Sequence, residues 1–329
     1  MSITRYYPFM SEESLRVARS IVAEAERVSD LSEALVEYVC EGNPPKDLVL
    51  FALRMTLLAK HMKSALKLAS AFDDYPEIQA SMLWAMFQTG QFSDRQEVIR
   101  ALDVVIETPF DAALQVEMLI FKGGVATGND SRRAFDRALR LCDTGSNLAP
   151  FRGDVIAASA VQRYPDEEYD LGLEEAREAL QIATVNNDPF VQIMALIALG
   201  LNTSDPQEAI EANLRVIDLA ELLGVSYYTH SSSNNLGYNY VAIGEYDKAV
   251  RYYQRAMAVV EREGIVTYVP YMNIAVLYGA LGDADLALRH AEKALELARR
   301  AAGDQPAPYI EMARALVLNG RLDETFDYL

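Results

Sequence analysis

Apolar residues recur at helical spacing through most of the chain, and short helix-breaking runs interrupt them at intervals. Alternating runs of β-branched residues are scarce, whereas the strong helix formers Ala, Leu, Glu and Arg are abundant. The breaking runs stand where turns between helices are needed, at residues 42–45, 73–76, 128–130, 165–166 and 204–206. The pattern therefore predicts an all-α chain of helices joined by short turns.

The clearest internal repeat lies in the last third of the chain. Gly244, Gly282 and Gly320 stand 38 residues apart. Gly244 and Gly282 follow helical patterns and precede an acidic residue, as expected where one helix ends and the next begins. A single helix pair of this size cannot bury its apolar face alone, so neighbouring pairs must stack.

A weaker form of the repeat extends toward the N-terminus. Small residues that could open the inner face of each second helix are Ala34, Ala65, Val98, Ala134, Ala176, Ala209, Ala249, Ala287 and Thr325. Their spacings vary from 31 to 42 residues, which is typical of degenerate helical hairpins rather than of a strict repeat. We therefore predict divergent hairpin repeats over residues 1–185 and regular ones over residues 186–329, continuous as one solenoid.

The C-terminal repeats resemble the tetratricopeptide repeat (TPR) superfamily. The residues that carry the resemblance are Leu236, Gly237, Tyr240, Gly244, Tyr246, Ala249, Tyr253 and Ala256. Two features depart from the family pattern: Glu261 stands where a proline is usual, and the period of 38 exceeds the usual 34. The resemblance implies an α-α superhelix of antiparallel helix pairs that presents a concave groove to a partner.

Asn235 and Asn273 occupy the same position of two successive repeats. In TPR proteins similar to kinesin light chain and in peptide-sensing bacterial regulators, asparagines at this position bind the backbone of an extended peptide. A side-chain amide suits that role because it offers a donor and an acceptor together. Alternatively, the two asparagines only tie adjacent helices together. The equivalent positions in the flanking repeats are Ala195 and Glu311, so the pair does not extend further.

The same resemblance predicts the other residues of the groove, which are Ser231, Asn234, Tyr238, Met272 and Val276. This mixture of polar, aromatic and flexible side chains suits a peptide. TPR co-chaperones that hold a C-terminal carboxylate use Lys and Asn where this chain has Asn234 and Tyr238. This difference from the co-chaperones argues against an acidic C-terminal tail as the ligand.

The charge of the chain narrows the choice of partners. With 48 acidic and 30 basic residues, the formal net charge is −18. Such a surface repels phosphate backbones and anionic lipid, so we expect no direct binding of nucleic acid or membranes. A basic or neutral protein or peptide is favoured, although high charge also serves solubility alone. The two cysteines, the lack of a signal-peptide pattern and the short apolar runs predict a soluble cytoplasmic protein.

No motif predicts an enzyme, a metal site or a cofactor. His61, His230 and His290 are scattered and lack the spacing of metal ligands. Residues 122–128 resemble a phosphate loop but lack its terminal Gly-Lys-Ser/Thr, and we interpret them as the turn between two helices. Residues 227–233, rich in tyrosine and serine, are interpreted as capping and solvating a helix entrance.

The sequence thus predicts an interaction module whose groove accepts an extended peptide or a partner helix. The alternative is the effector-sensing region of a bacterial signalling or transcriptional regulator, because TPR-like arrays of irregular period resemble the sensor part of such proteins. A third hypothesis is a structural scaffold, in which copies associate by end-to-end stacking into a homo-oligomer.

Overall fold

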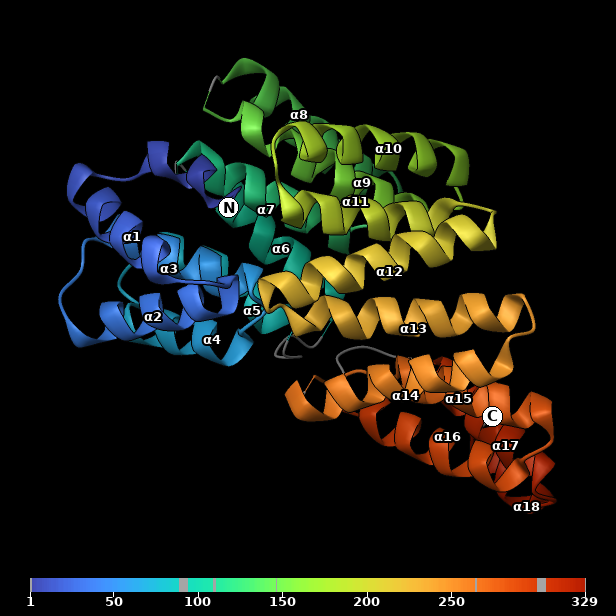
Figure 1. The fold of residues 1–329 in the computed structure, drawn as a ribbon. Helices are drawn as coiled ribbons and strands as arrows, with labels where there is room; N and C mark the ends of the chain where they lie inside the picture. Colours follow the sequence, from blue (N-terminus) through green and yellow to red (C-terminus); the bar gives the residue numbers. More distant parts are fainter. Residues whose placement is uncertain are drawn as a thin grey trace. The chain divides into compact units, whose positions relative to one another are not determined.

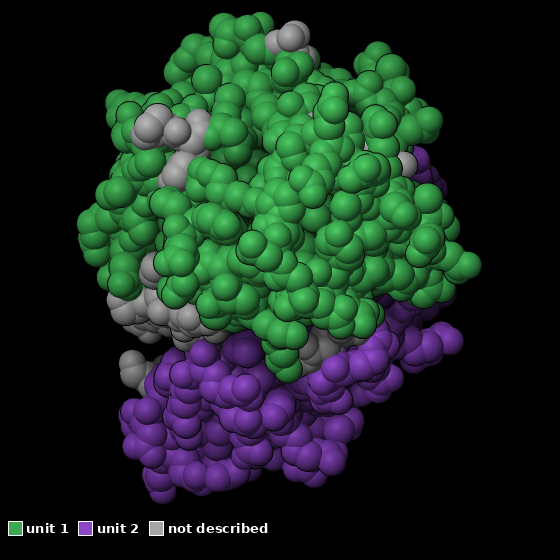
Figure 2. Space-filling view, turned by 90° about the vertical axis from the view of Figure 1, so that its left-hand side faces the viewer, with its two compact units in different colours: residues 1–204, 218–225 green, residues 205–217, 226–329 purple. Residues whose placement is uncertain are grey.

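A computed structural model describes residues 2–88, 94–108, 111–145, 147–263, 265–300 and 306–328 (Figure 1). Among these residues it contains eighteen α-helices and three 3-10 helices, with no strand. The chain forms two compact units, which are residues 1–204 with 218–225 and residues 205–217 with 226–329 (Figure 2). The prediction of an all-α fold is confirmed.

The first unit holds eleven α-helices, two 3-10 helices and the end of a twelfth α-helix. They are η1 (Ser2–Phe9), α1 (Glu12–Glu24), α2 (Val28–Glu41), α3 (Lys46–Leu58), α4 (Met62–Ala71), α5 (Pro76–Gln88), α6 (Arg95–Ile106), α7 (Ala112–Val125), α8 (Gly128–Thr144), η2 (Ala149–Phe151), α9 (Arg152–Arg163), α10 (Tyr169–Val185) and α11 (Pro189–Asn202). Helix α12 (Pro206–Leu223) is divided between the units.

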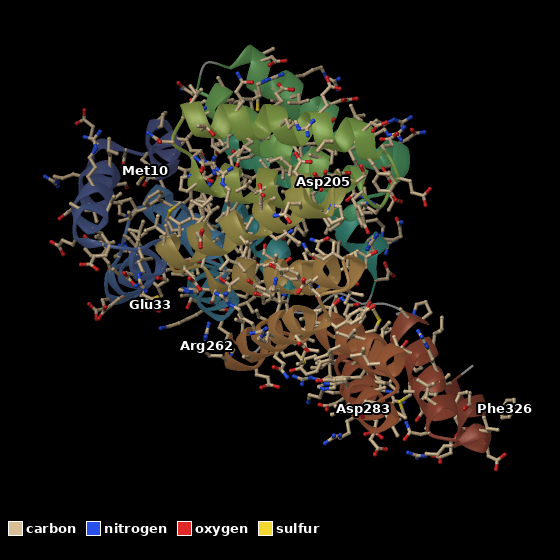
Figure 3. The ribbon with its side chains drawn as sticks, turned by 45° about the vertical axis from the view of Figure 1, so that its right-hand side comes forward. Met10, Glu33, Asp205, Arg262, Asp283 and Phe326 are labelled. Atoms are coloured by element: carbon tan, nitrogen blue, oxygen red, sulfur yellow. The ribbon has the colours of Figure 1, made fainter. Side chains whose placement is uncertain are left out.

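The second unit contains the beginning of α12 and the helices that follow it. These are α13 (Ser226–Ala242), α14 (Tyr246–Glu263), α15 (Val269–Leu281), α16 (Ala284–Ala298), α17 (Pro306–Leu318), α18 (Leu322–Thr325) and η3 (Phe326–Tyr328). Figure 3 labels Arg262 near the end of α14 and Asp283, whose carboxylate accepts the Leu286 N–H and so caps α16. Among the described residues, no helix is long and apolar enough to span a bilayer.

Each unit is a stack of helical hairpins, in which a first helix and a second helix pack against each other. The odd-numbered helices are the first helices, and each packs against the next one in the same unit: α3 on α5, α5 on α7, α7 on α9, α9 on α11, and then α13 on α15 and α15 on α17. The first helices of a unit therefore form one continuous layer, which is the layer that the resemblance assigns to ligand binding.

Glycines end the first helices of the C-terminal hairpins, as the repeat predicts. Gly244, Gly282 and Gly320 all have positive φ angles, of 79°, 85° and 72°. This left-handed conformation strains other residues because of their Cβ atoms, so the recurrence of glycine has a direct physical cause. Of the five predicted breaking runs, those at 42–45 and 165–166 lie wholly between helices. The runs at 73–76 and 204–206 end on the proline that begins α5 and α12, and the run at 128–130 begins α8.

A small residue of each of two first helices packs against an aromatic ring of the following second helix. A Cβ atom added to Gly237 would lie 2.5 Å from the ring of Tyr253, which is buried beside Ala249 and Ala256. In the first unit, Gly123 faces the ring of Phe135 at the same distance. Gly123 therefore belongs to the last turn of α7, and the interpretation of residues 122–128 as an interhelical turn was wrong for this half of the segment.

Candidate peptide-binding surface

The predicted groove residues come from two neighbouring first helices. Helix α13 carries Ser231, Asn234, Asn235 and Tyr238, and α15 carries Met272, Asn273 and Val276. Spacings of three, four and seven residues place the members of each set along one side of their helix. Because α13 packs against α15, the two sets can form one surface within the second unit.

A side-chain hydrogen bond joins the two helices at this surface. The Asn273 amide Nδ2 donates to the Asn234 Oδ1 over 2.9 Å, and both side chains are half-buried. The sequence paired Asn273 with Asn235, which has the same repeat position, but it is Asn234 that meets Asn273. Part of the predicted ligand-binding set therefore also holds the helices together. The alternative interpretation assigned this role to both Asn235 and Asn273, and of these two only Asn273 makes the bond.

The side chains of Asn235 and Tyr238 are less engaged in packing and hydrogen bonds than those of Asn234 and Asn273. Asn235 is half-buried, and its side chain makes no hydrogen bond with any other described residue. Tyr238 is 64% exposed, which is unusual for a large aromatic side chain in a packed repeat. Ser231 and Val276 are half-buried, whereas Met272 packs against the apolar core around Tyr253. The surface thus offers an amide and an exposed ring on one helix face.

Glu311 continues the series on the next first helix, α17. It is only 6% exposed, and its Oε1 has no hydrogen-bond partner among the described residues. The Arg314 guanidinium lies 3.8 Å from Oε2. Burial raises the pKa of Glu311, and the nearby arginine opposes that shift. The sequence analysis ended the series at this residue, although the spacing of 38 from Asn273 was the signal that could have included it.

The segment at residues 227–233 lies inside α13 and does not cap it. The His230 ring Nδ1–H donates to the Tyr227 carbonyl oxygen over 2.5 Å, and the two rings are 4.9 Å apart. Burial lowers the pKa of His230, and this hydrogen bond partly opposes the shift. Ser232 and Ser233 are buried. The interpretation of this segment as a solvated helix entrance was therefore wrong.

A buried cluster of charged and aromatic side chains, which no sequence pattern predicted, lies in the first unit. Arg5 of η1 donates through Nη1 to Asp154 of α9 over 2.6 Å and to Asp188 over 3.0 Å. Asp188 also accepts the Phe190 and Val191 N–H groups at the start of α11. Sequence separations of 149 and 183 residues leave no local pattern from which these pairs could be predicted.

A second arginine completes the cluster. Arg54 of α3 donates through Nε to both carboxylate oxygens of Glu117 on α7, at 3.1 and 3.0 Å. Its Nη2 lies 3.5 Å from Asp111, which caps α7. The cluster thus places four acidic side chains around two arginines. Burial raises the pKa of Asp154 to about 7, and the adjacent Arg5 guanidinium opposes the shift.

The described residues contain no group of three or more His, Cys, Asp and Glu side chains placed to hold a metal ion. Cys142 is buried and Cys40 is half-buried, and neither takes part in a disulfide. Burial raises the pKa of the Cys142 thiol to about 11, so that this side chain is protonated at neutral pH.

Comparisons with known proteins support the fold from two directions. Two family models described as tetratricopeptide repeat match residues 232–267 and 271–307. A comparison with curated protein sequences finds no significant match.

Several solved structures resemble the whole chain. A Rap protein complexed with competence and sporulation factor has a TM-score of 0.56 and 13% identity, and the match covers 99% of this chain and 84% of the Rap protein. The apo form of RapI has a TM-score of 0.51 and 13% identity, with 91% and 86% covered.

A third solved structure is a signal transduction ATPase with numerous domains from Pyrococcus horikoshii, which has a tetratricopeptide repeat sensor. Its TM-score is 0.54 and its identity 15%, and the match covers 97% of this chain. The chain spans 52% of the length of that protein. At these identities the likenesses show the fold alone.

The fold and the matched repeats together define a helical-hairpin repeat protein. Residues 232–307 contain tetratricopeptide repeats, and repeats of this kind in general serve protein interaction.

Proposed function

We propose that the second unit binds an extended peptide across the faces of α13 and α15. Asn235, with its unpaired half-buried amide, offers a donor and an acceptor to a peptide backbone, and the exposed ring of Tyr238 offers an apolar contact beside it. The observation that carries the proposal is this pairing of a free amide with an exposed ring on one helix face.

The hydrogen bond between Asn234 and Asn273 supports the proposal in a second way. It fixes the spacing of the two helices and leaves Asn235 available for a ligand. A surface that is already ordered loses little conformational freedom on binding, which favours affinity. The partner should be neutral or basic, since the chain carries a net charge of −18.

The experiment is the selection of peptides from a random 12-residue library on the wild-type chain, followed by affinity measurement on variants. The Asn235→Ala/Tyr238→Ala variant should bind the selected peptides at least tenfold more weakly, because it lacks both ligand contacts. Neither substitution removes a hydrogen bond between described residues, so circular dichroism should show unchanged helicity.

Tyr246→Ala provides the matched control, because Tyr246 is a similarly exposed tyrosine on the neighbouring second helix α14. It should leave affinity unchanged. The proposal is wrong if the peptides bind the double variant as tightly as the wild type, or if Tyr246→Ala weakens binding as much.

The second candidate function is the sensing of an effector within a bacterial regulator. It is supported by the two whole-chain likenesses whose names mention a repeat sensor and a bound sporulation factor. A thermal-shift screen separates the two functions: a small metabolite that raises the melting temperature would favour the sensor, and a peptide would favour the interaction module. In either case we propose that the chain itself is not an enzyme and needs no cofactor.

End-to-end stacking of copies stays a prediction. The exposed apolar side chains on which it depends belong to the last helices of the second unit, and include Ile310, Leu322 and Phe326.

A further inference from the structure

Arg5 and Tyr6 of η1 contact side chains that lie far from them in the sequence. Besides Phe151 of η2, the side chains around Arg5 and Tyr6 come from α3, from α7, from α9 and from Asp188, which caps α11. Helices α3, α7, α9 and α11 are first helices of their unit, as α13 and α15, which carry the proposed peptide surface, are of theirs. A short segment of this chain therefore already lies where a TPR-like stack would receive a ligand.

The aromatic contacts are as specific as the ion pairs. The Tyr6 ring meets Phe151 edge-on at a centroid distance of 5.5 Å and Phe51 at 6.4 Å. The guanidinium carbons of Arg5 and Arg54 lie 5.3 and 5.0 Å from the Tyr6 centroid, within the range of cation–π attraction. Arg5 and Tyr6 are both buried, at 7% and 4% exposure.

The hydrogen bonding of Arg5 is incomplete. One nitrogen, Nη1, serves both Asp154 and Asp188, while the buried Nε has no hydrogen-bond partner among the described residues. A buried donor without a partner is unfavourable, and buried ion pairs gain little once the loss of hydration is included. Arg5 is therefore bound less favourably than a fully hydrogen-bonded arginine would be, which leaves room for a competitor.

We propose that this cluster is a binding site for a partner polypeptide that carries an arginine beside an aromatic residue, and that residues 2–9 fill it as a tethered competitor. The carboxylates of Asp154 and Asp188 receive the guanidinium, and Phe51, Phe151 and Arg54 receive the ring. A short tether gives the competitor an effective concentration on the order of millimolar, so a weak partner is excluded and a strong one displaces the segment.

This site lies in the first unit and the surface proposed above in the second, so one can fail without the other. The test uses the full chain and a fluorescein-labelled peptide of residues 2–10, with anisotropy as the measurement. The Arg5→Ala/Tyr6→Ala variant should bind the peptide at least tenfold more tightly than the wild type does, because its own segment no longer competes. Adding Asp154→Asn to that variant should weaken binding about tenfold.

Two controls test whether binding depends on the arginine of the peptide and on the altered positions of the protein. A peptide carrying Arg5→Ala should bind the double variant at least tenfold more weakly than the unaltered peptide. The protein variant Arg133→Ala/Tyr164→Ala removes an exposed arginine and an exposed tyrosine from the same unit, and it should bind the peptide no better than the wild type.

The proposal is overturned if the folded double variant does not bind the peptide. It is also overturned if that variant binds the Arg5→Ala peptide as tightly as the unaltered peptide. If the double variant is unfolded, helicity is followed instead while peptide is added: a gain in helicity and melting temperature supports the site, and no gain overturns it. Light scattering tests whether the segment in the site comes from a second copy of the chain. In that case the wild type would be a dimer and the double variant a monomer, and the proposal of a tethered competitor would be wrong.

Discussion

Single side chains decide which helices approach closely. Gly237 and Gly123 each leave just enough room for an aromatic ring of the next helix, whereas Gly124, adjacent in sequence to Gly123, has no atom within 4 Å of its Cβ direction. The packing of a hairpin therefore depends on which of two neighbouring glycines faces the partner helix.

Gly237→Ala should lower the free energy of unfolding by about 1–3 kcal/mol, because the added methyl group would overlap the Tyr253 ring. Gly124→Ala is the matched control and should leave stability unchanged or raise it by up to about 1 kcal/mol, the helix-propensity gain. Chemical denaturation of both variants measures the difference. Equal effects of the two substitutions would contradict the packing argument.

His230 should give the second unit a defined dependence on pH. Burial lowers its pKa below the ordinary value of 6.5, so the folded state holds the neutral ring while the unfolded state binds a proton more readily. The free energy of unfolding should therefore fall as the pH drops below about 6.5. Partial burial and the charge of Arg289 also lower the pKa of His290, which adds to the trend.

The contribution of His230 is isolated by comparing the wild type with His230→Gln. At pH 8 both rings of the wild type are neutral, and this pH serves as the reference. Below it, the wild type should lose stability more steeply than the variant in urea denaturation. A parallel pH dependence of the two proteins would show that His230 is not held neutral.

The residues of a candidate site could be predicted only where the repeat itself carries them. The 38-residue period pointed to α13 and α15 and to a helix face on which Tyr238 is exposed. It could not show whether Asn234 or Asn235 meets Asn273, because one residue is a rotation of about 100° around the helix and the period fixes no rotation. The contacts of Arg5 join residues 149 and 183 positions apart, which no local pattern encodes.

At the scale of elements, most helix boundaries follow from local chemistry. Asp94, Asp111, Asp188 and Asp283 each accept backbone N–H groups at the start of a helix, and proline stands at the start of α5, α11 and α12. Gly282 ends α15 in the left-handed conformation. These signals are readable in sequence, which is why the helices were predicted more accurately than the contacts between them.

Gly282→Ala should destabilise the protein by about 1–2 kcal/mol, although no atom lies within 4 Å of the added Cβ, because the φ angle of 85° alone is unfavourable for alanine. Gly282→Asn should cost less, since asparagine tolerates this conformation better. Thermal denaturation of the two variants checks the order. If alanine is tolerated as well as asparagine, the end of α15 does not need the left-handed conformation.

At the scale of the whole molecule, the layer of first helices is the feature that joins fold and function. In the second unit it carries the amides and the exposed ring of the proposed peptide surface. In the first unit it carries the cluster that holds residues 2–9. The net charge of −18 then favours neutral or basic partners for both.

Photo-crosslinking tests the central claim most directly. A peptide selected on the wild-type chain is synthesised with benzoylphenylalanine at successive positions, and crosslinked residues are located by mass spectrometry. We expect crosslinks in the second unit on the first helices α13 and α15, around Asn235 and Tyr238. Crosslinks confined to the second helices α14 and α16 would contradict the central claim.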